Sequence, residues 1–226
     1  PGSQGRRFEV DMRLLQTGTQ GPVATSWTSF QSYQTSEAWV WEHMALTRAK
    51  VVAGPDNLAL DVTTFLEHLL RNKRTRDEVV LEVSQMRARI QAAKTPASLW
   101  DAKIGPGRLQ DIEMLAQAGA LIDGNAKGEI DAGLTAAVAS GLLSDAEGRD
   151  LKSLYASYSK LYQATRLLSD KPLDVETLGP AGKSFVLRAL EEETMECLEK
   201  RLSVSYTRSG AILDASLSIK NAENDP

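Results

Sequence analysis

The sequence predicts a mainly α protein, in which a helical bundle follows one or two strands left from an α+β domain. Residues 8–14 alternate strictly between apolar and charged side chains, which is the pattern of a half-buried β-strand. Most of the remaining chain repeats apolar residues at helical spacing, with Gly and Pro between the repeats. A lone strand leaves its backbone groups without partners. We therefore expect that the main sheet is missing and that the chain is a cut fragment.

Capping and breaking residues set the limits of the predicted elements. Ser26 and Ser36 are suitable N-caps, and Gly54-Pro55 is a suitable helix end. Val23–Thr25 is expected to form a short returning strand, and Trp100–Ile104 a short extended piece. We expect helices over residues 27–34, 37–52, 56 or 57 to 71, 77–93, 109–122, 131–140, 144–168 and 179–202, and a last helical stretch near residue 212.

Composition limits the classes of function. The 226 residues are 42% hydrophobic and 25% charged, with a formal net charge of −4, so we do not expect nucleic acid as a partner. No apolar run approaches the ~20 residues of a membrane span, so we expect no membrane partner. The single cysteine, Cys197, excludes an intramolecular disulfide and favours a reducing cytoplasm. His43 and His68 lack the ligand spacing of a zinc site.

The charged face of the predicted strand carries two carboxylates. Glu9 and Asp11 lie on that face together with Arg13, opposite the apolar side chains. Hard cations such as Mg²⁺ prefer carboxylate oxygens and keep phosphates and waters as their other ligands. The strand therefore suits a divalent cation. The alternative, which the strand by itself favours, is an edge strand with a solvated charged face.

The predicted helix at 37–52 is rich in tryptophan and charged residues. Its apolar residues occur nearly all round the helix, so we expect it to be mostly buried. Buried Glu42 and Arg48 would then need partners. For Glu42 we favour a structural salt-bridge network, whereas Arg48 either joins such a network or points into a phosphate site.

A glycine-rich turn precedes the predicted helix at 109–122. Lys103 comes before Gly105-Pro106-Gly107, and the free amides of a helix N-terminus attract anions. The turn is not a Walker A loop, because the lysine precedes the glycines. Asp111 lies on the apolar stripe of the helix, so we expect it to face inward and to pair with Lys103 or an arginine. The alternative for Asp111 is a favourable interaction with the helix dipole.

Taken together, these segments resemble the C-terminal half of glutamine synthetase adenylyltransferase, a bifunctional adenylyltransferase/deadenylylase with two nucleotidyltransferase modules of the DNA polymerase β type. Glu9–Leu14 resembles the family pattern Glu-Val-Asp-x-Arg-Leu, and Gly18–Pro22 resembles Gly-x-x-Gly-Pro. Glu37–Ala49 resembles Glu-Ala-Trp-x-Trp-Glu-His-x-Ala-Leu-x-Arg-Ala, and its tryptophan pair is typical of the adenylylating module. Lys103–Glu113 resembles Lys-x-x-x-Gly-x-x-x-Asp-Ile-Glu.

The resemblance implies roles for the candidate site residues. Asp11 matches the third metal carboxylate of a site for Mg²⁺ and ATP, and it is also a candidate base for a tyrosine hydroxyl. Glu9 would assist Asp11 in catalysis, while Arg13, Arg48 and Lys103 would contact phosphates or substrate.

The chain also departs from the family pattern. The first two metal carboxylates would precede residue 1, so the start of the nucleotidyltransferase module is lacking and we expect the fragment by itself to be inactive. The family continues Arg-Leu-Arg-Pro-Ser-Gly after the strand, but residues 13–18 read Arg-Leu-Leu-Gln-Thr-Gly. Arg108 stands where many members of the family have a second glycine.

The resemblance implies a division into the C-terminal part of a nucleotidyltransferase domain, residues 1–94, and a helical regulatory or docking domain, residues 95–226. The parent enzyme would transfer AMP to a tyrosine of glutamine synthetase and respond to the PII signal protein and to glutamine. In a second hypothesis the fragment is a non-catalytic helical module that docks glutamine synthetase or PII. In a third it is a purely structural bundle.

Overall fold

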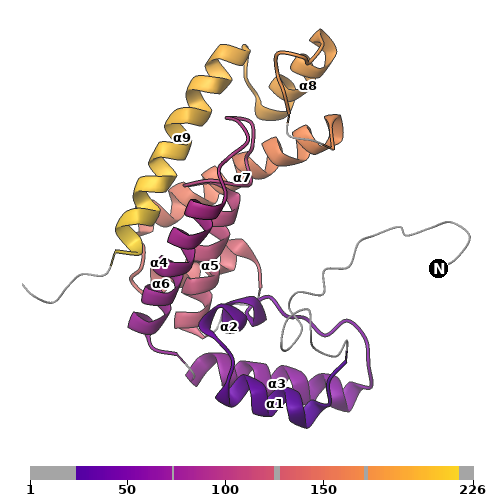
Figure 1. Cartoon of the computed structure of the whole chain (residues 1–226), viewed down its shortest axis with the longest axis vertical. Helices are drawn as coiled ribbons and strands as arrows, with labels where there is room; N and C mark the ends of the chain where they lie inside the picture. Colours follow the sequence, from indigo (N-terminus) through magenta and orange to yellow (C-terminus); the bar gives the residue numbers. More distant parts are fainter. Residues whose placement is uncertain (1–23, 73, 125–127, 171–172, 219–226) are drawn as a thin grey trace, which may run out of the picture.

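The computed structural model describes residues 24–72, 74–124, 128–170 and 173–218. In these ranges the chain forms nine helices, which confirms the mainly α fold class (Figure 1). The predicted strand at residues 8–14 lies outside the described residues, and Ala24 and Thr25 of the predicted returning strand are irregular. The helices are α1 (Trp27–Ser36), α2 (Val40–Leu46), α3 (Asp56–Asn72), α4 (Arg76–Ala93), α5 (Leu109–Asp123), α6 (Ile130–Ala139), α7 (Asp145–Leu168), α8 (Pro180–Leu190) and α9 (Met195–Ser216).

The helix predicted at 37–52 is wrong in length and burial. α2 covers only Val40–Leu46, because Trp39 has an extended backbone and acts as its N-cap. The Glu42 carboxylate accepts the Trp39 backbone N–H at 2.8 Å and so completes the helix start. Trp39 is 62% exposed, whereas Val40 and Met44 are buried. The tryptophan-rich segment therefore buries only one side.

The helix predicted at 179–202 is also wrong, because α8 and α9 are separate. Glu191 adopts a left-handed backbone with φ of 56° and ends α8. The Thr194 hydroxyl accepts the Cys197 N–H and caps α9, which continues to Ser216.

The extended piece predicted at 100–104 is wrong as well. One Asp101 carboxylate oxygen accepts the N–H groups of Lys103 and Ile104 and holds this segment in turns.

The central helix of the bundle is α5. Its buried side chains include Ile112, Leu115 and Leu121, and its closest packing is against α6. Helix α4 adds Val79 and Val83 to the same hydrophobic cluster, which later extends to α7 and α9. The described parts of residues 24–94 and 95–218 therefore share a core. The functional division at residue 94 stays a prediction.

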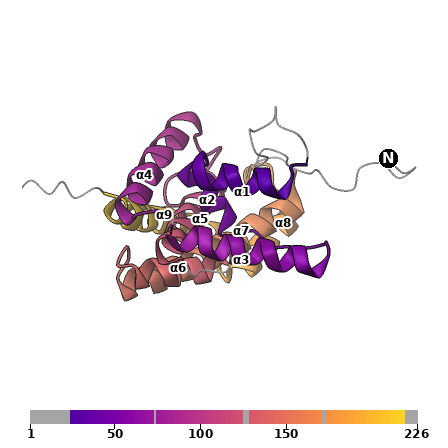
Figure 2. The same cartoon turned by 90° about the horizontal axis from the view of Figure 1, so that it is seen from below.

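Helices α1 and α3 lie together at one end of the molecule, while α8 and the start of α9 lie at the other (Figures 1 and 2). The long helix α9 packs against α5, α7 and α8, and its last turns reach α4, where Asp214 pairs with Arg87 (Figure 1). Among the described residues, no helix combines the length and the apolar character needed to cross a membrane.

Candidate functional site

Three predicted site residues, Glu9, Asp11 and Arg13, lie outside the described residues, and their roles stay predictions. Within residues 24–218, apart from the short gaps in the description, no three acidic, histidine or cysteine side chains are grouped closely enough to hold a metal ion.

Arg48 and Lys103 both lie near tyrosines of α7. The Lys103 Nζ atom is 5.7 Å from the centre of the Tyr162 ring, and the Arg48 charge acts on Tyr155. Both basic residues are exposed, so the expected burial of Arg48 is wrong. Tyr155 and Tyr162 are seven residues apart and share one face of α7, about 10 Å apart along the axis. The structure therefore places both predicted phosphate contacts along one helix face.

Glu42 has a structural role, but through neutral partners. Its half-buried carboxylate accepts the Tyr33 hydroxyl at 2.9 Å and the Trp39 backbone N–H at 2.8 Å. These two bonds join α1 to the start of α2. The expected salt-bridge network is thus replaced by hydrogen bonds to a hydroxyl and a backbone amide.

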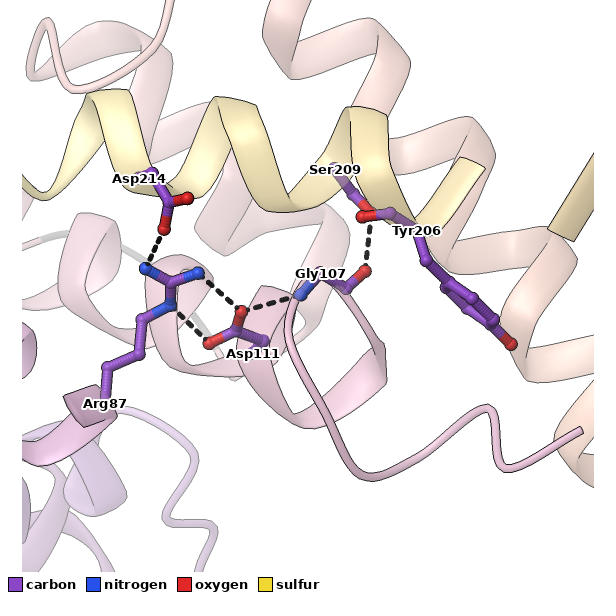
Figure 3. Close-up of polar contacts among 6 residues, drawn as sticks. All are labelled: Arg87, Gly107, Asp111, Tyr206, Ser209 and Asp214. Atoms are coloured by element: carbon purple, nitrogen blue, oxygen red, sulfur yellow. Dashed lines mark hydrogen bonds and ion pairs between the residues drawn. The ribbon is translucent and has the colours of Figure 1, made fainter. Parts of the chain in front are cut away.

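Asp111 faces inward and pairs with an arginine, as predicted. Arg87 of α4 donates from Nε to Oδ1 of Asp111 at 2.7 Å and from Nη2 to Oδ2 at 3.0 Å (Figure 3). Asp111 is 5% exposed and Arg87 is 8% exposed. A third bond runs from Nη1 of Arg87 to Oδ1 of Asp214 on α9, at 2.5 Å. This charge cluster, Arg87–Asp111–Asp214, joins α4, α5 and α9.

The two carboxylates favour the charged form of Arg87. Burial by itself lowers the pKa of Arg87, but hydrogen bonding and attraction from Asp111 and Asp214 outweigh burial and raise it. The Arg87 guanidinium donates two hydrogen bonds to the Asp111 carboxylate, one to each oxygen. The Asp111 carboxylate also accepts the Gly107 backbone N–H. Because both its oxygens are hydrogen-bonded within the protein, Asp111 supports the fold and is not available to a substrate.

The glycine turn lies directly against α9. Gly107 has φ of +71°, and a Cβ atom there would lie 2.4 Å from the Tyr206 carbonyl oxygen and 2.5 Å from the Gly210 nitrogen. Its carbonyl accepts the buried Ser209 hydroxyl at 2.6 Å, and its N–H donates to Asp111 at 2.8 Å (Figure 3). The Gly107 amide is therefore engaged by the protein's own carboxylate and is not directed at a bound anion.

Arg108, which departs from the family pattern, is a packing residue. It is 7% exposed, and its guanidinium carbon lies 4.2 Å from the centre of the Tyr206 ring. It also donates to the carbonyls of Ser98 and Asp101. Burial lowers the pKa of Arg108, although Tyr206 and Asp101 oppose this effect. The arginine thus fastens the 98–108 turn to α9.

Four residues of this region, Arg87, Tyr206, Ser209 and Asp214, were not predicted from the sequence pattern. One signal was available for Arg87, which follows Val83 by four residues and precedes Ile90 by three. It therefore lies on the apolar stripe of α4, where an arginine needs a buried partner. Asp214 had no comparable signal, because its side chain is 71% exposed.

Buried tyrosines make the stability of this region sensitive to alkaline pH. Burial raises the pKa of Tyr158 to about 12, against the opposing effects of Ser209 and Arg108. The unfolded chain releases this proton near pH ~10, while the folded chain retains it. Stability is therefore fully present below pH ~10 and falls between about pH 10 and 12.

We expect Tyr158→Phe to make this loss of stability less steep. Urea denaturation at a series of alkaline pH values, on the parent and the variant, measures the two slopes. If the free energy of unfolding falls equally steeply with pH in the two proteins, Tyr158 does not cause the loss of stability. Tyr155, whose pKa burial and Glu113 raise to about 12, would keep part of the slope in both proteins.

The described helices and their charge cluster define a helical domain whose buried polar groups support the fold. The family described as glutamate-ammonia ligase adenylyltransferase matches residues 1–64. A bifunctional glutamine synthetase adenylyltransferase/adenylyl-removing enzyme of Mesorhizobium japonicum is 35% identical over 210 residues, which are 89% of this chain and 21% of that enzyme. The enzyme of the same name from Agrobacterium fabrum is 35% identical over 219 residues, 92% of this chain and 22% of its own length.

A shorter match with a higher identity is to the enzyme of that name from Rhizobium meliloti, which is 43% identical over 122 residues, 54% of this chain and 12% of its own length. The chain therefore belongs to the glutamine synthetase adenylyltransferase family, as its motifs predicted. It spans about a fifth of the length of the Mesorhizobium and Agrobacterium relatives.

Proposed function

We propose that this chain is part of an enzyme that transfers AMP from ATP to a tyrosine of glutamine synthetase, and that it comes from the C-terminal, adenylylating half. The observation that carries this proposal is the similarity, over 89% of the chain, to an enzyme named for glutamine synthetase adenylylation. The paired tryptophans, Trp39 and Trp41, support the choice of the adenylylating half.

Asp11 is the residue proposed to hold Mg²⁺, with Glu9 assisting it. Their carboxylates suit the preference of Mg²⁺ for oxygen ligands. When bound, the ion would neutralise charge on the triphosphate and on the leaving pyrophosphate. Asp11 is also the candidate to accept the proton of the substrate tyrosine hydroxyl.

The proposed phosphate or substrate contacts are Arg13, Arg48 and Lys103. Arg48 and Lys103 are exposed, and each lies near a tyrosine on the same face of α7, so a ligand can reach both. Residues 1–226 include one of the three carboxylates that the family pattern requires. We therefore propose that residues 1–226 by themselves do not catalyse the transfer.

The protein substrate and the regulators are proposed from the same family. Glutamine synthetase is the proposed protein substrate, and the PII signal protein and glutamine are the proposed regulators. A cytoplasmic location agrees with these partners and with the single cysteine.

Calorimetric titration of Mg²⁺-ATP into residues 1–226 tests the proposed nucleotide site. We expect binding that is lost in Asp11→Ala and retained in Asp61→Ala, a matched change on the exposed surface of α3. Absence of binding in the parent would contradict a retained nucleotide site and favour the docking hypothesis. Incorporation of AMP into glutamine synthetase by this chain, lost in Asp11→Ala, would contradict the proposed inactivity.

A further inference from the structure

One side of α7 presents two tyrosines and an arginine in a row. Tyr155, Ser159, Tyr162 and Arg166 follow each other at spacings of four, three and four residues, so they share one side of the helix. Both tyrosines are half-buried, and Arg166 is exposed. At 1.5 Å per residue, the row extends about 16 Å along the helix axis. We call this surface the α7 tyrosine face.

Two further cations border the α7 tyrosine face. The Lys103 Nζ atom lies 5.7 Å from the centre of the Tyr162 ring. The charge of Arg48 opposes the rise in the pKa of Tyr155 that burial and Glu113 cause, so Arg48 lies near that hydroxyl. The segment after α2, the glycine turn and the end of α7 thus each contribute one cation to the same stretch of surface.

These three cations form no ion pair with a carboxylate in the part of the chain that the structure describes. Arg166 donates to the backbone carbonyl of Asp170. Neighbouring carboxylates are engaged by uncharged donors. Glu113 accepts the Tyr155 hydroxyl at 3.0 Å, and Asp101 accepts the backbone N–H groups of residues 97, 103 and 104. The positive charge of the face is therefore left for a ligand.

Two lysines elsewhere on α7 do have carboxylate partners. Lys152 and Lys160 each lie 3.0 Å from a carboxylate oxygen, of Asp131 and Glu191 respectively. The chain as a whole has a formal net charge of −4, so an excess of basic residues does not explain the three cations on one face. Together with the tyrosine rings, they make a surface that is complementary to a negatively charged ligand.

We propose that the α7 tyrosine face, with Arg48, Lys103 and Arg166, binds an acidic peptide segment of the protein substrate. The inference rests on the proposed function for a protein substrate, and it assigns Arg48 and Lys103 to that protein instead of to phosphate. The length of the face supports the assignment. An extended peptide of about five residues spans the same ~16 Å, whereas the charges of a triphosphate are grouped on three adjacent phosphoryl groups. Tyrosine and arginine are also enriched in protein interfaces.

Binding of an acidic peptide to residues 1–226 tests the proposal. The probe is a fluorescein-labelled peptide with glutamate at every second position around one tyrosine, and the matched probe carries glutamine in place of each glutamate. Fluorescence anisotropy at low ionic strength measures the binding of both. We expect only the acidic probe to bind, with a Kd that rises as salt is added, because exposed charges are screened.

Single substitutions locate the binding on the molecule. We expect Lys103→Gln and Arg166→Gln each to raise the Kd of the acidic probe about two- to five-fold, the size of one exposed charge contact. The triple variant, which adds Arg48→Gln, should raise it at least about ten-fold. All three side chains are exposed, so the fold should be retained, which circular dichroism checks.

Arg149→Gln is the matched control, because it removes an exposed arginine from another side of the same helix. Its Kd for the acidic probe should equal that of the parent. An equal rise in Kd for Arg149→Gln and Lys103→Gln would overturn the proposal, as would a parent that does not bind the acidic probe.

Titration of Mg²⁺-ATP into the same variants separates this inference from the proposed nucleotide site. We expect Lys103→Gln and Arg166→Gln to bind ATP as the parent does. If they bind ATP more weakly but bind the acidic probe normally, the cations contact phosphate and the inference is wrong. A parent that binds the acidic probe but not ATP would contradict the nucleotide site and support the peptide site.

Discussion

Replacement of Asp111 with alanine is expected to lower the free energy of unfolding by about 3–5 kcal/mol, because it leaves a buried guanidinium without its main partner. Arg87 is 8% exposed and loses two of its hydrogen bonds in this variant. The Gly107 N–H also loses its acceptor. With a total stability of about 5–15 kcal/mol for a typical domain, this loss is large enough to unfold a substantial fraction of the protein.

Urea denaturation followed by circular dichroism measures the effect. The matched control is Asp214→Ala, which removes the other carboxylate that bonds to Arg87. Because the Asp214 side chain is 71% exposed, its loss should cost less than about 1 kcal/mol. Similar losses in the two variants would contradict the view that the buried contact dominates this cluster.

Gly133→Ala is expected to destabilise the protein by about 1–3 kcal/mol through overpacking of α5 against α6. A Cβ atom at this position would lie 2.5 Å from the Ala116 carbonyl oxygen and 2.9 Å from its carbon. These are backbone atoms of α5, so the helices must separate to admit the methyl group. Helix propensity has the opposite sign, because alanine in a helix interior is favoured over glycine by about 1 kcal/mol.

Gly210→Ala is the control that separates the effect of overpacking from the effect of helix propensity. Gly210 also lies inside a helix and is buried, but the nearest atom to its Cβ would be the Gly107 nitrogen at 3.9 Å, an ordinary contact. We therefore expect a neutral effect or a gain of up to about 1 kcal/mol. Thermal denaturation of both variants decides between the two effects, and a stabilising Gly133→Ala would contradict the close approach of α5 and α6.

Strong local signals in the sequence correctly predicted several elements. The apolar period predicted α4 at 77–93 against an observed Arg76–Ala93, and the span predicted at 144–168 differs from the observed α7 by one residue. The inward direction of Asp111 also followed from local pattern, because its position on the α5 stripe is a matter of helical geometry.

Local signals failed where backbone conformation departed from propensity. Residues 179–202 look continuous in sequence, but Glu191 takes a left-handed conformation that is rare outside glycine and asparagine. At α2, the extended backbone of Trp39 and the reach of Glu42 delayed the helix start. These choices depend on how the flanking helices pack and are not visible in a single local window.

For this protein the sequence by itself determined the family, the helical class and the inward position of Asp111, because motifs, periodicity and caps act over a few neighbouring residues. Only the tertiary structure decided that Arg87 is the partner of Asp111 and that Asp214 joins them. Arg87 and Asp214 are 127 residues apart, and they meet because α9 packs across the glycine turn. A contact over such a separation depends on the packing of whole helices, in which Gly107 allows α9 to approach its backbone.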